Sequence, residues 1–177
     1  MKRIVVLIAI CIVALLIALA WTGRLASSSC CNDTLTLEEI RKLKSAALLG
    51  DQKAIWKLQE DASNRGAKDE SLQYLYKLAN EFHDSEARYL YFSTIANDSQ
   101  LFKLKRKQAV DQLVTAAVEG HVASQFFLAT YYEAGTFGFE MNKHEALKWY
   151  KIASKNGNEQ AKIKLKELEN SQVDPIN

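Results

Sequence analysis

Residues 116–168, AAVEGHVASQFFLATYYEAGTFGFEMNKHEALKWYKIASKNGNEQAKIKLKEL, decide the fold because one pattern occurs in them twice. The pattern is a small residue, a glycine, a second small residue and a leucine, each four positions after the last. Its copies, 37 positions apart, are Ala116, Gly120, Ser124, Leu128 and Ala153, Gly157, Ala161, Leu165. A fixed period of this size in helix-forming sequence is typical of stacked repeats. Each repeat is a pair of antiparallel helices that cannot bury its apolar face alone.

Two further copies of the pattern lie nearer the N-terminus. They are Ala46, Gly50, Ala54, Leu58 and a degenerate copy, Ala79, His83, Ala87, Tyr91, in which histidine replaces the glycine. We call each copy a seam. The seam centres at 50, 83, 120 and 157 are 33, 37 and 37 residues apart. Alanine-rich helices can give one such match by chance, but four matches at a nearly constant spacing indicate a repeat.

The residue types of a seam follow from helix packing. Small residues let two helix backbones approach closely, and a glycine takes the left-handed conformation at a helix end without a Cβ penalty. The sequence therefore predicts an all-α fold, an α/α solenoid of about three to four helix pairs. The repeat domain is expected over residues 36–171, followed by a frayed tail over 172–177.

Individual helices are predicted from apolar spacing and capping residues. Thr36 and Asp51 are expected to cap the first two helices. The later helices are expected over 70–82, 85–96, 106–119, 122–134, 143–156 and 159–170.

The best-matching residues resemble the Sel1-like repeat family, which is related to tetratricopeptide repeats. They are Gly120, Ser124, Leu128, Tyr132, Gly135, Ala146, Trp149, Tyr150, Ala153 and Gly157. The departures are Ala129 for a glycine, Asn142 for an aspartate and one extra residue before Gly138. The resemblance covers 116–165 best, 46–58 less well and 67–115 weakly. It implies a non-enzymatic solenoid that binds other proteins; many bacterial members are envelope proteins, some of them immunity proteins encoded beside type VI secretion effectors.

The N-terminus carries an export or membrane signal. Lys2 and Arg3 precede residues 4–21, which hold 18 residues without a charge. Such a run is long enough to span a bilayer as a helix, with its positive flank in the cytoplasm. Two interpretations of residues 1–21 stay open: an uncleaved signal anchor, or a signal peptide cleaved after the small-x-small site at residues 18–20. Either one predicts a periplasmic protein, anchored in the inner membrane or secreted across it, with residues 22–35 as a linker.

Charge and motifs exclude several function classes. The chain has 23 basic and 21 acidic residues, and without Lys2 and Arg3 it has 21 of each. A near-neutral domain does not attract nucleic acid. His83, His121 and His144 lack metal-ligand spacing, so they are expected at caps or on the surface. With no nucleophile or phosphate-binding motif, we predict no catalytic residue, no metal and no cofactor.

The first helix of each pair is expected to line a concave binding face. Seven residues occupy equivalent positions on these helices: Lys57, Asp61, Leu90, Thr94, Phe127, Tyr131 and Lys164. The leading hypothesis is an immunity-type protein that binds and neutralises a type VI secretion effector, such as a lipase. The alternatives are an envelope assembly or sensor scaffold, and an envelope hydrolase with an unrecognised site.

Overall fold

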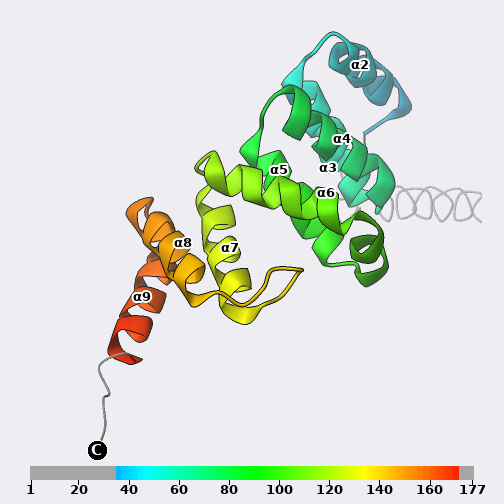
Figure 1. Ribbon diagram of the computed structural model, residues 1–177. Helices are drawn as coiled ribbons and strands as arrows, with labels where there is room; N and C mark the ends of the chain where they lie inside the picture. Colours follow the sequence, from blue (N-terminus) through cyan, green and yellow to red (C-terminus); the bar gives the residue numbers. More distant parts are fainter. Residues whose placement is uncertain (1–34, 172–177) are drawn as a thin grey trace, which may run out of the picture. The chain divides into compact units, whose positions relative to one another are not determined.

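The computed structural model describes residues 35–171, and within that range the chain forms eight α-helices and no strand (Figure 1). They are α2 (Leu37–Leu48), α3 (Gln52–Asn64), α4 (Lys68–Glu81), α5 (Ser85–Ala96), α6 (Ser99–Val118), α7 (Val122–Ala134), α8 (Lys143–Lys155) and α9 (Glu159–Ser171). The all-α prediction is therefore confirmed. The predicted signal segment, nearly all of the linker and the frayed tail lie outside the described residues. None of α2–α9 is both long enough and apolar enough to cross a bilayer.

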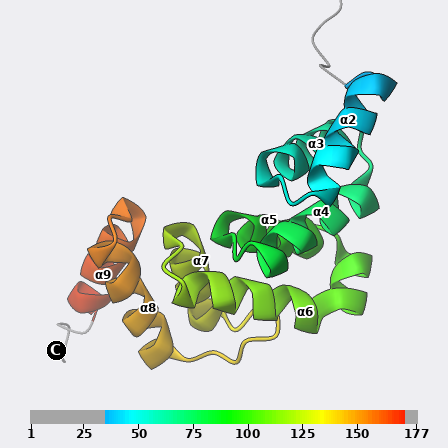
Figure 2. The same cartoon turned by 90° about the horizontal axis from the view of Figure 1, so that it is seen from above.

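Each helix packs mainly against the next one in the sequence, from α2 on α3 to α8 on α9 (Figures 1 and 2). This nearest-neighbour packing is the defining property of a solenoid. Two clusters of buried side chains result. The larger extends from α2 to α7, and the smaller joins α7, α8 and α9 around Tyr150, which is fully buried.

Polar side chains start most of these helices by accepting backbone N–H groups that the first turn leaves unpaired. Thr36 and Glu39 form a capping box at α2, and Asp51 accepts from two amides at the start of α3. Both predicted caps are thus confirmed. The remaining side-chain caps of α5 to α8 are Asp84, Asp98, His121 and Asn142.

The four seams have the geometry that their residue types predict. Gly50, Gly120 and Gly157 have φ values of +88°, +100° and +95°, and His83 at the degenerate seam also has a positive φ, 52°. The small residue four positions later is buried at every seam: Ala54, Ala87, Ser124 and Ala161. At seam 120 the turn is closed by a bond from the His121 amide to the Ala116 carbonyl, 3.0 Å long.

Replacing Gly120 by valine tests the backbone requirement at a seam. A Cβ at this position would meet no atom within 4 Å, so the cost comes from the positive φ alone. We expect Gly120→Val to lower the free energy of unfolding by about 1–2 kcal/mol. Urea unfolding followed by circular dichroism measures this loss. Gly120→Asn is the control, since asparagine tolerates positive φ better; equal losses for both variants would contradict the explanation.

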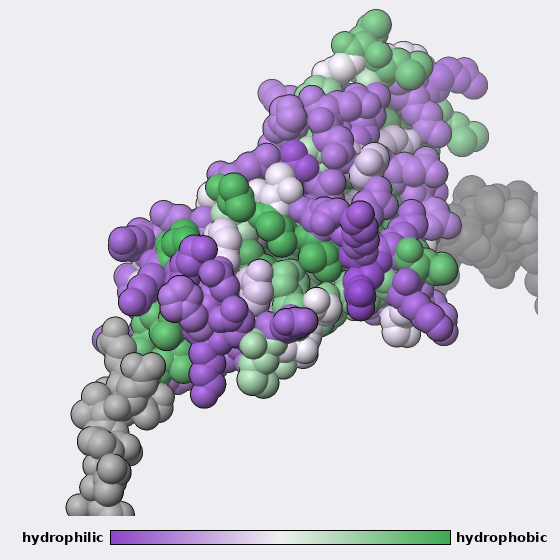
Figure 3. Space-filling view, viewed as in Figure 1, coloured by the Kyte–Doolittle hydropathy of each residue, from purple (hydrophilic) through white to green (hydrophobic). Residues whose placement is uncertain are grey.

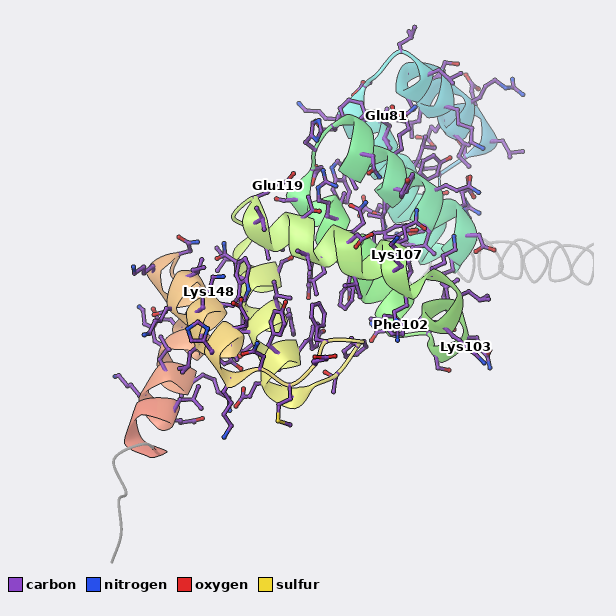
Figure 4. The ribbon with its side chains drawn as sticks, in the orientation of Figure 1. Glu81, Phe102, Lys103, Lys107, Glu119 and Lys148 are labelled. Atoms are coloured by element: carbon purple, nitrogen blue, oxygen red, sulfur yellow. The ribbon has the colours of Figure 1, made fainter. Side chains whose placement is uncertain are left out.

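Most predicted helix bounds lie within two residues of the observed ones, but the predicted start of α6 is wrong by seven residues. The helix expected over 106–119 begins at Ser99, because Asp98 caps it by accepting the amides of Gln100 and Leu101. Lys68, on α4, forms an ion pair with Asp98, with Nζ 2.7 Å from a carboxylate oxygen. Lys103 and Lys107 lie within α6, on its exposed surface (Figure 4).

Candidate protein-binding surface

The seven predicted binding residues lie at equivalent positions of α3, α5, α7 and α9, but they do not form one exposed row. Lys57 is exposed on α3. Leu90 and Thr94 are half-buried on α5, where the Thr94 hydroxyl donates to the Leu90 carbonyl at 2.8 Å. Lys164 is half-buried on α9 and pairs with Glu167 at 3.2 Å.

Asp61 departs from its expected place on the surface. Only 3% of this residue is exposed. Its carboxylate accepts the Leu35 amide at 2.9 Å and the Arg65 Nε at 2.7 Å. The chain entering the domain therefore covers Asp61, which joins residue 35 to α3 and does not face a partner.

The buried carboxylate makes stability depend on pH. Desolvation raises the pKa of Asp61, but the hydrogen bonds from Leu35 and Arg65 outweigh it, so the pKa lies below the usual 3.8. A carboxyl whose folded-state pKa is lowered stabilises the protein above its unfolded-state pKa, and loses this effect as the pH falls through the folded-state pKa.

Comparing the wild-type chain with Asp61→Asn isolates this contribution. We expect Asp61→Asn to unfold about 1–2 kcal/mol more easily at pH 7, since Arg65 loses one of its two charged partners and keeps only Glu70. The difference should shrink as the pH falls from about 4, where the carboxyl of the unfolded chain becomes protonated, through the lower pKa of the folded protein. Urea unfolding at pH 7 and through this range measures it; a difference that stays constant would contradict the assignment.

Phe127 and Tyr131 belong to a line of four rings that the sequence did not reveal. We call Tyr89, Phe127, Tyr131 and Phe139 the aromatic strip. Consecutive rings are nearly parallel, with interplanar angles of 17°, 27° and 21° and centroid distances of 5.7, 6.2 and 6.3 Å. All four residues are half-buried, so part of each residue is open to solvent.

Three elements position the aromatic strip. Tyr89 lies on α5, and Phe127 and Tyr131 are one turn apart on α7. Phe139 comes from residues 135–142, the α7–α8 loop. Gly135 begins that loop in the left-handed conformation, and the Asn142 amide closes it on the Tyr132 carbonyl at 2.8 Å.

Core aromatics support the strip from behind. The Phe137 ring is 4.6 Å from Tyr131 and meets Phe102 of α6 edge-on at 5.3 Å. Figure 4 shows Phe102 beside the tip of the α7–α8 loop, and Figure 3 shows hydrophobic side chains gathered over α6, α7 and this loop. The loop is thereby fixed to α6 and α7, which makes the strip rigid.

The strip carries two phenol hydroxyls that can donate to a partner. Burial raises the pKa of Tyr131 to about 12, and burial together with the nearby Glu86 charge raises the pKa of Tyr89. Both groups stay protonated at neutral pH. Neither hydroxyl has a hydrogen-bond partner among residues 35–171.

A histidine and a glutamate form the polar end of the strip. The His121 ring lies 5.2 Å from that of Tyr89, and its Nε2 is 2.8 Å from Glu86. Its Nδ1 accepts the Ser124 amide at 3.2 Å and so caps α7. The prediction of a capping role is confirmed for His121.

The three histidines do not come together in the structure. His83, His121 and His144 lie on three separate helix junctions, the last of them exposed. Within residues 35–171, no three His, Cys, Asp or Glu side chains come close enough to share a metal ion. The aromatic strip is the candidate site that this geometry offers.

A solved structure of the same architecture is similar to this chain. It is described as a Sel1 repeat protein from Oxalobacter formigenes, is 28% identical, and superposes with a TM-score of 0.57. The similarity covers 74% of this chain and 99% of the other. The sequence matches no protein-family model, and it has no match among curated proteins.

Proposed function

Because this chain is a Sel1-like repeat protein, we propose that it is a scaffold that binds another protein through the aromatic strip. The observation that carries the proposal is the line of four near-parallel, half-buried rings with two hydroxyls that no described residue engages. Rigid tyrosine and phenylalanine side chains provide large contact areas at little entropic cost, and tyrosine is enriched among residues that dominate binding energy.

The partner class follows from the shape and charge of the strip. Its rings come from two neighbouring repeats and one loop, so they offer a firm, mostly apolar strip with few charges. Such a surface suits a folded protein or an amphipathic helix that contributes apolar side chains at its centre and hydrogen-bond acceptors beside Tyr89 and Tyr131.

We further propose that the scaffold acts in the bacterial envelope as an immunity-type protein. The uncharged run over residues 4–21 supports the location, and the family resemblance supports the role. In this proposal the strip binds a toxic effector, such as a lipase delivered by type VI secretion. The scaffold then blocks the effector sterically, without chemistry of its own.

Site-specific crosslinking tests both the binding of a protein by the aromatic strip and the immunity role. A photoreactive phenylalanine replaces Phe127 in the full chain, and the control chain carries it at Leu104, which is 82% exposed on α6. We expect one protein to be crosslinked in intact cells from position 127 and not from position 104. A partner that is a secreted enzyme would support the immunity role. A partner that is another envelope protein would contradict the immunity role but would still support a protein-binding scaffold. Crosslinks from position 104 alone would contradict the proposal that the aromatic strip is the binding surface.

Truncating the strip should weaken binding of the crosslinked partner. We expect Phe127→Ala to raise the Kd about 30-fold, which corresponds to roughly 2 kcal/mol for a central aromatic residue. Tyr131→Phe removes only a hydroxyl and should raise the Kd about 3- to 10-fold. Calorimetry with the purified partner measures both values, and Leu104→Ala is the control. Unchanged affinity in a folded Phe127→Ala chain would refute the assignment.

A further inference from the structure

A groove of about 390 Å³ lies between α4 and α6. Its floor is formed by Leu72 of α4 and Tyr91 of α5, which are 3% and 2% exposed. Volumes of roughly 300–1,000 Å³ are typical of sites that bind small molecules. The residues on its walls are Asp69, Gln73 and Tyr76 of α4 and Lys105 and Gln108 of α6.

Two side-chain contacts between α4 and α6 close the groove at its ends. Lys68 pairs with Asp98 at 2.7 Å where the two helices start, and Gln112 donates to Asn80 at 3.3 Å where α4 ends. Every wall residue lies between these contacts on its own helix. Lys68 and Asn80 are about 18 Å apart along α4, at about 1.5 Å per residue. The groove therefore fits a short ligand better than a continuous chain.

The two walls carry opposite charges that have no partner in the domain. Asp69 on α4 and Lys105 on α6 are both exposed, and neither forms an ion pair or a hydrogen bond with any residue of 35–171. The neighbouring charges of Lys68 and Asp98, by contrast, neutralise each other. A molecule with both an ammonium and a carboxylate group therefore complements the groove, with its ammonium at Asp69 and its carboxylate at Lys105.

Neutral polar groups and two aromatic rings complete the lining. Gln73 and the Tyr76 hydroxyl form no hydrogen bond within residues 35–171. Gln108 Oε1 accepts the Tyr91 hydroxyl at 2.9 Å, so its amide nitrogen is left to donate to a ligand. The rings of Tyr76 and Tyr91 lie 5.7 Å apart at an angle of 49°, and Tyr76 is 42% exposed. An aromatic side chain of a ligand can pack on the accessible ring of Tyr76.

We propose that this groove binds a small zwitterion, an amino acid or dipeptide with an aromatic side chain. The site does not depend on the aromatic strip. Tyr91 follows Tyr89 by two residues on α5, about 200° around the helix, so the groove and the strip lie on different sides of α5. A ligand in the groove contacts α4, α5 and α6 and so links two neighbouring repeats. The scaffold can then bind a protein and a small molecule at the same time.

An NMR titration of the ¹⁵N-labelled full chain in detergent micelles tests the site. The ligand is alanyl-phenylalanine, and the comparison ligands are its N-acetyl form and its C-terminal amide, each of which lacks one charge. We expect saturable shift changes at Gln73 and Gln108, with a Kd on the order of 1 mM for the free dipeptide. Loss of either ligand charge should raise the Kd about 3- to 5-fold.

Charge-removing variants assign each ligand charge to its residue. Asp69→Asn should raise the Kd of the dipeptide about 3- to 5-fold and should abolish the effect of N-acetylation. Lys105→Gln should do the same for the C-terminal amide. The controls Asp111→Asn and Lys103→Gln remove the same charges from exposed positions of α6 that do not line the groove, so they should leave the Kd unchanged.

Several results would overturn the proposal. No saturable shift up to about 20 mM dipeptide, or shift changes confined to the aromatic strip, would show that the groove is not the site. Equal affinity for the three forms of the dipeptide would show that no zwitterion is recognised. Equal effects of the control variants would show that net charge, and not the groove, attracts the peptide. None of these results would affect the aromatic strip, because crosslinking from position 127 tests it separately.

Discussion

Phe92→Ala is expected to lower the free energy of unfolding by about 3–5 kcal/mol. Phe92 is 1% exposed at the centre of the larger cluster. Its ring lies 5.7 Å from Tyr131 and meets Phe137 edge-on at 5.9 Å. Removing it leaves a cavity between α5, α7 and the α7–α8 loop, which the surrounding helices can close only in part. Urea unfolding followed by circular dichroism measures the loss.

The same substitution should also weaken partner binding, because Phe92 supports the aromatic strip without belonging to it. Tyr131 would lose part of the surface behind its ring and become free to change its orientation. Leu104→Ala is the control, with an expected change within about 0.5 kcal/mol at an exposed site. If Phe92→Ala costs less than 1 kcal/mol, or leaves the affinity unchanged, the strip does not depend on the core as described.

The seams could be predicted from the sequence because their requirements are local. A glycine at a helix end and small residues four positions to either side leave a pattern with a fixed period, and the structure bears it out at Gly50, Gly120 and Gly157. The degenerate seam could also be recognised, from its four-residue steps. In the structure, His83 takes the positive φ that a glycine has at the other seams.

The aromatic strip could not be predicted, because its geometry depends on contacts between distant residues. Phe127 and Tyr131 were identified from their repeat positions, but Tyr89 lies one residue before the predicted position on α5. Phe139 comes from the α7–α8 loop, where this sequence departs from the family pattern. The density of aromatic residues was the available signal, yet periodicity alone does not show which rings of a helix face each other.

Asp61 and the start of α6 show a second limit of sequence periodicity. Asp61 occupies the same repeat position as Thr94 and Tyr131, but the chain at Leu35 covers it. The repeat pattern does not predict that contact. The start of α6 has a local cause, since Asp98 caps the amides of Gln100 and Leu101, but a cap is not part of the apolar period, and Lys68 adds a contact from 30 residues away. Of the two features, only the burial of Asp61 depends on a contact, with the Leu35 amide, between residues that are distant in the sequence and meet after folding.

Arg88→Ala is expected to cost about 2–3 kcal/mol, because Arg88 is a buried cation that joins three helix ends. Its side chain is 7% exposed. Nε donates to Glu119 at 3.0 Å, and a terminal nitrogen donates to Gln112 at 2.8 Å. Gln112 in turn donates to Asn80 at the end of α4, at 3.3 Å. The guanidinium thus connects α4, α5 and α6 beside the degenerate seam, where no glycine shapes the turn.

The forked geometry of the Arg88 guanidinium group, and not its charge alone, should decide how much stability Arg88→Ala removes. Arg88→Lys keeps the charge but cannot bond Glu119 and Gln112 together, so we expect it to recover less than half of the loss. A double-mutant cycle with Glu119→Gln separates the two bonds; because Glu119 is partly exposed, the coupling energy between Arg88 and Glu119 should be about 1 kcal/mol. Full recovery by lysine would show that a positive charge suffices at this junction. No coupling would show that the effect comes from the contacts of Arg88 with Gln112 and with His83, whose Nδ1 lies 3.4 Å from a terminal nitrogen of Arg88.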